Sequence, residues 1–302
     1  MEAEGTGEVV EEVEDAFEES LTIGEASEAL RAHPRVYWAR PERSSPFRRI
    51  VSLVPSLSES FVSLGMRDRL VGVTSYCVHP ESAFRDLPKL GGTKDADVEA
   101  IGATKPDLVI ANQEENTARV VRKLADRGID VWVTYPRTVR AGAELLRDLA
   151  ALGASPAAID RVVEPVFRAL DGAAAEASVP AERRPSVFCP IWRDPWMTIA
   201  RDTYIHDLIE VCGGRNVFPG EPGERRYPLI DLAAVEQAAP DVILLPDEPY
   251  AFSEKDREEL LALDCPAAKQ DRVHLIDGTL VSWYGPRIAE AIRVLAPIFA
   301  NS

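Results

Sequence analysis

The stretch Asp97-Val-Glu-Ala-Ile-Gly-Ala-Thr-Lys-Pro-Asp-Leu-Val-Ile-Ala111 recurs as Asp231-Leu-Ala-Ala-Val-Glu-Gln-Ala-Ala-Pro-Asp-Val-Ile-Leu-Leu245, with four of fifteen positions identical. Both copies have the pattern of a short amphipathic helix, a Pro-Asp break and an apolar run that suits a strand buried on both faces. Open parallel sheets bind ligands at the carboxyl ends of their strands. The repeat therefore predicts two similar α/β lobes, each with a loop at that edge, at 112–115 and 246–250.

The length and charge of the chain exclude several classes of protein. Its 302 residues suffice for two domains, and its formal charge of −16 argues against a nucleic-acid surface, which needs clustered Lys and Arg. No apolar run approaches the roughly 20 residues that span a bilayer. Nine acidic residues and no basic residue occur in 1–20, which predicts a disordered acidic tail.

Strand, helix and turn signals divide the chain into four ranges. These are a partly disordered acidic extension and linker (1–46), an N-terminal lobe (47–154), a connecting helix (155–180) and a C-terminal lobe (181–302). The sequence Ser56-Leu-Ser-Glu59 matches a capping box at a helix start, and Ser155-Pro156 restarts the chain as a helix. Because an interior proline disrupts a helix, Pro165 predicts a bend near Asp160-Arg161 or two shorter helices.

Aromatic residues concentrate at the predicted strand ends and loops. They are Tyr76, Trp192, Trp196, Tyr227, Tyr250 and Trp283. Such rings can stack on a flat ligand, although each one alone is equally compatible with ordinary packing. Arg193 is one of several arginines near the same loops, and it could bind carboxylate or phosphate groups of a ligand through forked hydrogen bonds. The alternative for such arginines is a solvated surface position.

Catalytic and metal-binding patterns are sparse. Cys77 and His79 lie two residues apart at a predicted strand end and could approach a metal ion, with a packing role as the alternative. The four cysteines are predicted to be buried, reduced thiols. Neither a glycine-rich nucleotide fingerprint nor a Gly-x-Ser-x-Gly elbow occurs. We therefore predict a protein that is not an enzyme, with no catalytic residue and no catalytic cofactor.

Several motifs in order resemble the periplasmic-binding-protein family for metal chelates, of the helical-backbone metal receptor type. The resemblance covers about residues 48–300 and is greatest for the cobalamin-binding proteins of ABC importers. The motifs that carry it are Arg49-Ile-Val-Ser-Leu-Val-Pro-Ser-Leu-Ser-Glu59, Leu70-Val-Gly-Val-Thr-Ser-Tyr76, Val98-Glu-Ala-Ile101 with Lys105-Pro-Asp-Leu-Val-Ile110, and Val211-Cys-Gly-Gly-Arg-Asn-Val-Phe218. The resemblance implies two lobes with parallel sheets flanked by helices, joined by one long helix. It also implies that a ligand binds in the cleft between the lobes.

The resemblance also implies roles for single residues. Pro55 and Tyr76 match positions that line the cleft in cobalamin-binding relatives, Tyr227 falls where another aromatic residue stands, and Trp192 lies beside a further one. Family members dock on the permease through one glutamate per lobe. Glu99 matches the first of these, whereas the second copy of the repeat carries Ala233 there, one helical turn before Glu236.

The leading hypothesis is a monomeric substrate-binding protein that traps a corrinoid, haem or ferric siderophore for ABC-type uptake, with cobalamin or another corrinoid as the first choice. The N-terminus as written has no signal peptide, which predicts a cytoplasmic protein. A start further upstream would instead place it in the periplasm or anchor it on the outer face of a membrane. One alternative is a cytoplasmic corrinoid- or tetrapyrrole-handling enzyme or metallochaperone on the same scaffold. A second is an interaction protein that kept the fold without the ligand.

Overall fold

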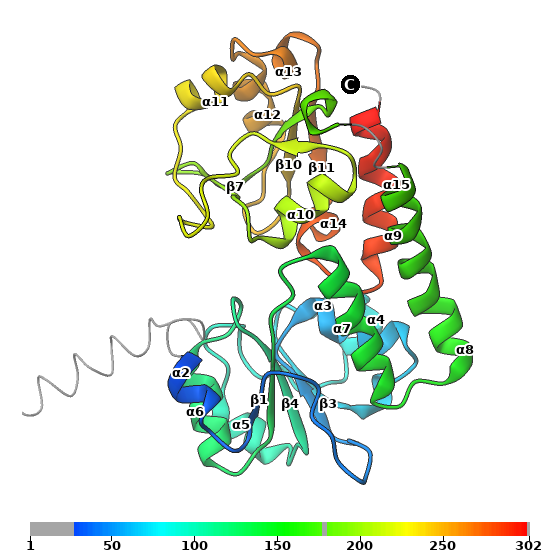
Figure 1. The fold of residues 1–302 in the computed structure, drawn as a ribbon. Coiled ribbons are helices and arrows are strands. Elements are labelled where there is room, and N and C mark those ends of the chain that lie inside the picture. Colours follow the sequence, from blue (N-terminus) through cyan, green and yellow to red (C-terminus); the bar gives the residue numbers. More distant parts are fainter. Residues whose placement is uncertain (1–26, 177–179, 301–302) are drawn as a thin grey trace, which may run out of the picture. The chain divides into compact units, whose positions relative to one another are not determined.

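The computed structural model describes residues 27–176 and 180–300 (Figure 1). The predicted acidic tail at 1–20 lies outside the described residues. The chain divides into two compact units. The first unit runs to Tyr135 and includes Arg147–Ile159, and the second unit consists of Pro136–Leu146 and Asp160 onward. Each unit is an α/β body with a parallel sheet, which confirms the predicted fold class.

The first unit contains a five-stranded sheet in the order β1-β5-β4-β2-β3, and every pair in it is parallel. Its strands are β1 (Val36–Tyr37), β2 (Ile50–Ser52), β3 (Leu70–Val73), β4 (Leu108–Asn112) and β5 (Val131–Thr134). Its helices are α2 (Ser27–Arg31), α3 (Pro55–Ser63), η1 (Arg67–Arg69), α4 (Glu81–Phe84), α5 (Val98–Ala103), α6 (Ala118–Asp126) and α8 (Pro156–Ala158), and α7 (Val139–Ala151) has residues in both units.

Helices cover both faces of the first sheet. On one face α2, α5 and α6 pack together (Figure 1), and Val121 and Leu124 of α6 form a core with Val51 and Val109 of the strands. On the opposite face α3 contacts β2 and β3 and buries Phe61 completely. The sheet is thus covered on both sides, which leaves its strand ends as the edges from which loops reach solvent.

The second unit contains a four-stranded parallel sheet in the order β11-β10-β6-β9 and a separate antiparallel pair, β7-β8. Its strands are β6 (Ser186–Phe188), β7 (Pro190–Trp192), β8 (Met197–Thr198), β9 (Arg215–Asn216), β10 (Val242–Pro246) and β11 (Val273–Ile276). Its helices are α9 (Glu164–Glu176), η3 (Ala181–Arg183), α10 (Tyr204–Val211), α11 (Leu232–Ala238), α12 (Glu254–Leu261), α13 (Pro266–Lys269), α14 (Thr279–Ser282) and α15 (Arg287–Ala300), after the π-helical turn η2 (Ile159–Val163).

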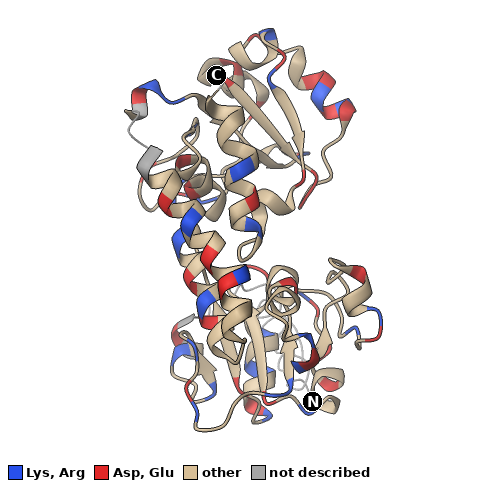
Figure 2. Ribbon diagram, turned by 90° about the vertical axis from the view of Figure 1, so that its right-hand side faces the viewer, with Lys and Arg blue, Asp and Glu red and all other residues tan. Residues whose placement is uncertain are grey.

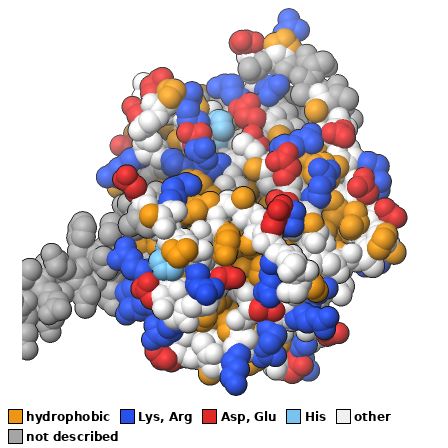
Figure 3. Space-filling view, turned by 60° about the horizontal axis from the view of Figure 1, so that its bottom comes forward, with side chains coloured by type: hydrophobic (Ala, Val, Ile, Leu, Met, Phe, Trp, Pro, Cys, Tyr) orange, Lys and Arg blue, Asp and Glu red, His pale blue; other side chains and the backbone are white. Residues whose placement is uncertain are grey.

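The second sheet is likewise covered on both sides. Helices α11, α12 and α13 lie together on one side (Figure 1), where Val235 and Leu260 pack against Ile243 of β10. On the other side α10 and α15 bury Leu208 and Leu295. Charged residues lie mostly on the helices and loops (Figure 2), and the central strands β2, β4, β5, β6 and β10 contain none. On the face shown in Figure 3, acidic and basic side chains are intermingled.

The repeated stretch forms the same structure twice. Asp97 caps α5 by accepting hydrogen bonds from the amides of Glu99 (3.0 Å) and Ala100 (2.9 Å), and Asp231 caps α11 through the amide of Ala234 (2.7 Å). The apolar runs that follow are β4 and β10, and both are buried along their whole length. These caps and strands confirm the predicted helix, break and strand in each copy.

Two local expectations are wrong. Helix α3 begins at Pro55 with Val54 as its N-cap, so Ser56 is buried inside the helix and is not its cap. The reason is that proline at the first helical position already has the required φ and needs no hydrogen-bond donor. Within the range 1–46, predicted as an acidic extension and linker outside the first lobe, Val36 and Tyr37 form β1 by pairing with Val131 and Trp132 of β5. The first sheet therefore starts before residue 47.

The helical segment after Ser155 agrees with its sequence signals. Ser155 caps α8 through the amide of Ala158 (3.2 Å), with Pro156 in the first turn. The turn at Ile159–Val163 is π-helical, immediately before Pro165 in α9. A wider turn accommodates the proline ring and the hydrogen bond it cannot donate, which accounts for the irregularity predicted near Asp160-Arg161.

Candidate functional site

Pro55 and Tyr76 lie at the carboxyl edge of the first sheet. Ser52 at the end of β2 pairs with Val73 at the end of β3, so the residues that follow both strands emerge at one edge. Pro55 is buried in the first turn of α3, whereas Tyr76 is 62% exposed. A Cβ atom on Gly92 would lie 3.2 Å from Cε2 of the Tyr76 ring, so the ring packs against that glycine. Tyr76 therefore offers a supported, exposed aromatic face.

A buried polar network holds the loop that carries Tyr76. The Cys77 thiol lies 3.1 Å from Oγ of Ser58 and 3.2 Å from Oγ1 of Thr74, and Ser58 donates to Oγ of Ser52 (2.9 Å). Burial raises the pKa of the Cys77 thiol, against the hydrogen bonds from Ser58 and Thr74. The thiol is therefore protonated at neutral pH, and its role is to anchor the loop on β2 and α3.

His79 follows in the same loop and is exposed. Residues 27–176 and 180–300 contain no group of three or more His, Cys, Asp or Glu residues able to hold a metal ion. The structure thus adds no further metal ligands to the pair Cys77 and His79. All four cysteines are buried and free, as predicted.

Four rings of the second unit form what we call the aromatic cluster: Trp192, Trp196, Tyr250 and Phe252. Trp192 meets Tyr250 edge-on with ring centroids 5.7 Å apart, and Tyr250 lies 4.7 Å from Phe252. Phe252 in turn stacks on Trp196 at 5.8 Å with an interplanar angle of 11°. Trp196 is buried and Trp192 is 45% exposed. The cluster therefore presents Trp192 to solvent on a base of packed rings.

Arg193 is held inside the second unit by acidic side chains. Its Nη1 donates to Asp256, its Nη2 lies 2.6 Å from Oε2 of Glu259, and its Nε lies 3.6 Å from Asp194. The guanidinium also lies 5.4 Å from the centroid of the Trp196 ring. Only 17% of the Arg193 side chain is exposed. This differs from the expectation that Arg193 offers its fork to a ligand, because carboxylates already occupy it.

Asp256 links this arginine to the start of α12. Its Oδ2 accepts hydrogen bonds from the amide (2.9 Å) and hydroxyl (2.8 Å) of Ser253, and its Oδ1 accepts from Arg193. Burial alone would raise the pKa of the Asp256 carboxyl, but the hydrogen bonds from Ser253 and Arg193 outweigh it and lower that pKa. Asp256 is therefore ionised at neutral pH although only 5% of its side chain is exposed.

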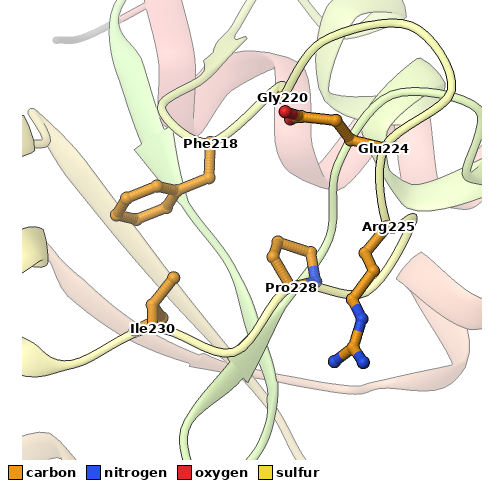
Figure 4. Close-up of a pocket in the computed structure, with 6 residues that line it drawn as sticks. All are labelled: Phe218, Gly220, Glu224, Arg225, Pro228 and Ile230. Atoms are coloured by element: carbon orange, nitrogen blue, oxygen red, sulfur yellow. The ribbon is translucent and has the colours of Figure 1, made fainter.

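Tyr227 lies next to the β7-β8 pair. The segment around it runs alongside β8, since the amide of Thr198 donates to the carbonyl of Pro228 (3.0 Å) and the amide of Ile230 donates to the carbonyl of Trp196 (3.0 Å). The Arg226 guanidinium lies 5.3 Å from the centroid of the Tyr227 ring. A pocket of about 420 Å³ opens beside this segment (Figure 4) and is lined by Phe218, Gly220, Glu224, Arg225, Pro228 and Ile230.

Trp283 ends α14 and is buried, with 8% of its surface exposed. The Arg287 guanidinium lies 5.0 Å from the centroid of its ring, and Arg287 pairs with Asp277 at 3.5 Å. Trp283 therefore has a packing role within the second unit, as Trp196 does.

Glu99 projects from α5, and 79% of its side chain is exposed. It forms an ion pair with Arg127. In the second copy of the repeat, Ala233 is exposed, and Oε1 of Glu236 accepts a hydrogen bond from the amide of Asp264 (2.8 Å). Glu236 is thus used inside its own unit.

Sequence reasoning missed three contributors to the site, namely Phe252, Asp256 and Glu259. The spacing of Ser253 and Asp256 matches a capping box, and that signal could have drawn attention to Asp256. Nothing local indicates that Arg193 pairs with Asp256, because 63 positions separate them.

Within the described ranges, no helix combines the length and apolar character needed to cross a membrane.

Comparison with known proteins agrees with this architecture. The profile of the family described as "Periplasmic binding protein" matches residues 50–279. An uncharacterized ABC transporter substrate-binding lipoprotein of Bacillus subtilis, YvrC, is 27% identical over 256 residues, covering 82% of this chain and 79% of the relative. The vitamin B12-binding protein of Vibrio campbellii is 29% identical over 212 residues, covering 70% of this chain and 75% of the relative.

Solved structures show the same fold. The periplasmic vitamin B12-binding protein BtuF of Vibrio cholerae superposes with a TM-score of 0.71 at 22% identity, over 84% of this chain and 96% of that one. The periplasmic heme-binding protein RhuT of Roseiflexus sp. RS-1 superposes with a TM-score of 0.68 at 25% identity, over 84% of this chain and 98% of that one.

Proposed function

Because the chain belongs to the periplasmic binding protein family, we propose that it is the substrate-binding component of an ABC importer for a metal chelate of the B12 or haem type. A corrinoid is the first candidate, since B12-binding proteins are among the relatives. The observation that carries the proposal is the exposure of Tyr76 and Trp192, at 62% and 45%. Tyr76 lies in the loop after the parallel strand β3, and Trp192 is the last residue of β7 in the antiparallel pair. Large exposed rings on a rigid base suit stacking on a flat macrocycle.

The proposed contacts are chosen by exposure, except for Pro55, which is buried and is chosen for its place at the sheet edge that carries Tyr76. Tyr76 in the first unit, with Pro55 beneath the same edge, and Trp192, Tyr227 and Tyr250 in the second unit are the residues we propose to meet the ligand. Trp196 and Trp283 support their loops from inside, since both are buried. The protein acts by binding and release, without a chemical step of its own. The comparisons do not favour an enzyme or a metallochaperone.

The proposed location of the protein in the cell rests on the locations named for its relatives. They include a lipoprotein and periplasmic proteins, so we propose that this chain works on the outer side of the cytoplasmic membrane, and the expectation of a cytoplasmic protein has no support from them. A monomer remains our prediction. Separation of the outer fraction from the cytoplasm of the producing cell, followed by detection of the chain, tests the location. Recovery with the cytoplasm would contradict it.

Titration tests the ligand. The purified chain is titrated with cyanocobalamin, haemin and a ferric siderophore, followed by tryptophan fluorescence and calorimetry. Trp192→Ala should weaken binding of the preferred chelate about tenfold, the loss of one stacked ring. Leu275→Ala, which trims an exposed apolar side chain of β11, is the matched control and should leave affinity unchanged. If the wild-type chain binds none of the three compounds, the proposed function is wrong.

We propose Glu99 as the contact to the permease. Its ion pair with Arg127 is exposed on both sides, and such pairs contribute about 0–1 kcal/mol. An arginine on the permease could therefore replace Arg127 at little cost in free energy. Glu99→Gln should reduce chelate uptake by cells while leaving the affinity of the purified chain unchanged. Glu236→Gln is the comparison, and equal losses of uptake for both variants would argue against a specific role for Glu99.

A further inference from the structure

We propose that Arg193 is a positioning residue that couples α12 to the aromatic cluster, so that carboxylates which never meet the ligand set how tightly it is bound. This inference rests on the proposed function. It assigns a role to Asp256 and Glu259. These carboxylates contact Arg193, and the exposed ring of Trp192 lies at the other end of the series of contacts that leads from Arg193 through the aromatic cluster.

The Arg193 guanidinium binds two carboxylates of one helix at the same time. Asp256 and Glu259 are three residues apart on α12, so their side chains lie on one face of the helix. Nη1 of Arg193 binds the first and Nη2 the second. A planar guanidinium that binds two carboxylates at once has its orientation set in two directions. The residue after β7 is thereby tied to the first turns of α12.

A stack of aromatic rings lies beside the guanidinium. The guanidinium lies 5.4 Å from the Trp196 centroid, and Trp196 stacks on Phe252, the residue before the Ser253 cap of α12. The turn between β7 and β8 is thus held by the segment at 250–259 through both charge and ring contacts. Trp192, at the start of that turn, contacts Tyr250 of the same segment.

The surroundings of the guanidinium carry a net negative charge. The guanidinium is surrounded by Asp194, Asp256 and Glu259, which gives this group a formal charge of −2 at neutral pH. This net negative charge would repel an acidic group of a ligand, which would meet the carboxylate of Asp194, since 85% of that side chain is exposed. Arg193 is therefore suited to holding the loop and unsuited to recognising an anion.

The experiment compares the two sides of the fork. Arg193→Lys keeps the charge without the planar fork, and Glu259→Gln removes one acceptor charge from α12. Glu258→Gln removes the same charge from the neighbouring exposed position and is the matched control. Dissociation constants for cyanocobalamin and haemin, thermal stability, and hydrogen exchange of the amides at 190–198 are measured for each variant.

Positioning predicts that Arg193→Lys and Glu259→Gln change affinity in the same direction. Both should weaken binding by about three- to tenfold and speed exchange at 190–198, whereas Glu258→Gln should match the wild type. Direct contact between Arg193 and the ligand predicts opposite signs, since loss of Glu259 would free the guanidinium. Unchanged or tighter binding by Glu259→Gln therefore overturns the inference.

The exchange measurement separates this inference from the proposed function. If the wild-type chain binds neither cyanocobalamin nor haemin, the affinity arm reports on the proposed function alone. Exchange at 190–198 in the unliganded variants then decides the positioning role. Rates equal to those of the wild type in both Arg193→Lys and Glu259→Gln would show that α12 does not hold the loop.

Discussion

Removal of the Phe252 ring should break the contacts that join Tyr250 to Trp196 in the aromatic cluster. It should therefore change ligand affinity as well as stability, whereas the loss of another buried ring should change stability alone. Phe252 is 4% exposed and lies between Trp196, at 5.8 Å, and Tyr250, at 4.7 Å. Phe299 of α15 is 2% exposed and packs close to Gly214 in the same unit. Phe252→Ala and Phe299→Ala thus delete equal side chains from equally buried positions.

The expected loss of stability is similar for the two variants. Truncation of a buried phenylalanine to alanine costs about 3–5 kcal/mol through lost burial and the cavity left behind. At about 2–4 °C per kcal/mol for a protein region of this size, Tm should fall by about 6–20 °C in each case. The ring contacts of Phe252 place it toward the upper end of the range, since aromatic pairs add about 0.5–1.5 kcal/mol beyond burial.

The assay separates stability from site geometry. Denaturant unfolding gives the free energy of unfolding, near-ultraviolet circular dichroism reports the packing of Trp192, Trp196 and Tyr250, and titration gives the affinity for cyanocobalamin. Phe252→Ala should change all three, and Phe299→Ala only the first. If the two variants have the same near-ultraviolet spectrum and the same affinity, the cluster does not support Trp192 and the reasoning is refuted.

Further predictions concern stability. Gly142→Ala should destabilise the protein, because the new Cβ would lie 2.8 Å from Cβ of Tyr284 and overpacking costs about 1–3 kcal/mol. Gly172→Ala in α9 should stabilise it by about 1 kcal/mol through helix propensity, since the new Cβ meets nothing within 4 Å. Denaturant unfolding measures both changes, and a more stable Gly142→Ala variant would contradict the packing. Asp231→Ala should cost about 1 kcal/mol by removing the α11 cap, measured in the same way, and no loss would mean that the cap is replaced by water. Burial lowers the pKa of His206, and the nearby carboxylates of Glu210 and Asp207 offset this shift only in part. The contribution of His206 to stability is therefore present above about pH 6.5 and is lost as the pH falls through the lower pKa that His206 has in the folded state. Unfolding at several pH values should show that drop in the wild type and a smaller one in His206→Gln, and equal pH dependence would exclude His206 as its source.

Local sequence signals predicted much of the fold. Asp97 and Asp231 cap their helices, and the Pro-Asp breaks precede β4 and β10, because caps, breaks and buried runs depend on residues within a few positions. The strand at Val36–Tyr37 escaped prediction, since a two-residue strand exists only through its pairing with β5. The cap predicted at Ser56 failed for a local reason, the proline before it.

For the candidate site, local signals in the sequence indicate which residues lie at or just after the strand ends of each unit. They predicted the positions of Tyr76, which comes after β3, and Trp192, which is the last residue of β7, and both side chains are exposed. The burial of Trp196 and Trp283 and the pairing of Arg193 with Asp256 and Glu259 are visible in the tertiary structure alone. Periodicity and turn chemistry act over a few residues, whereas burial and ion pairing depend on which distant segments the fold brings together.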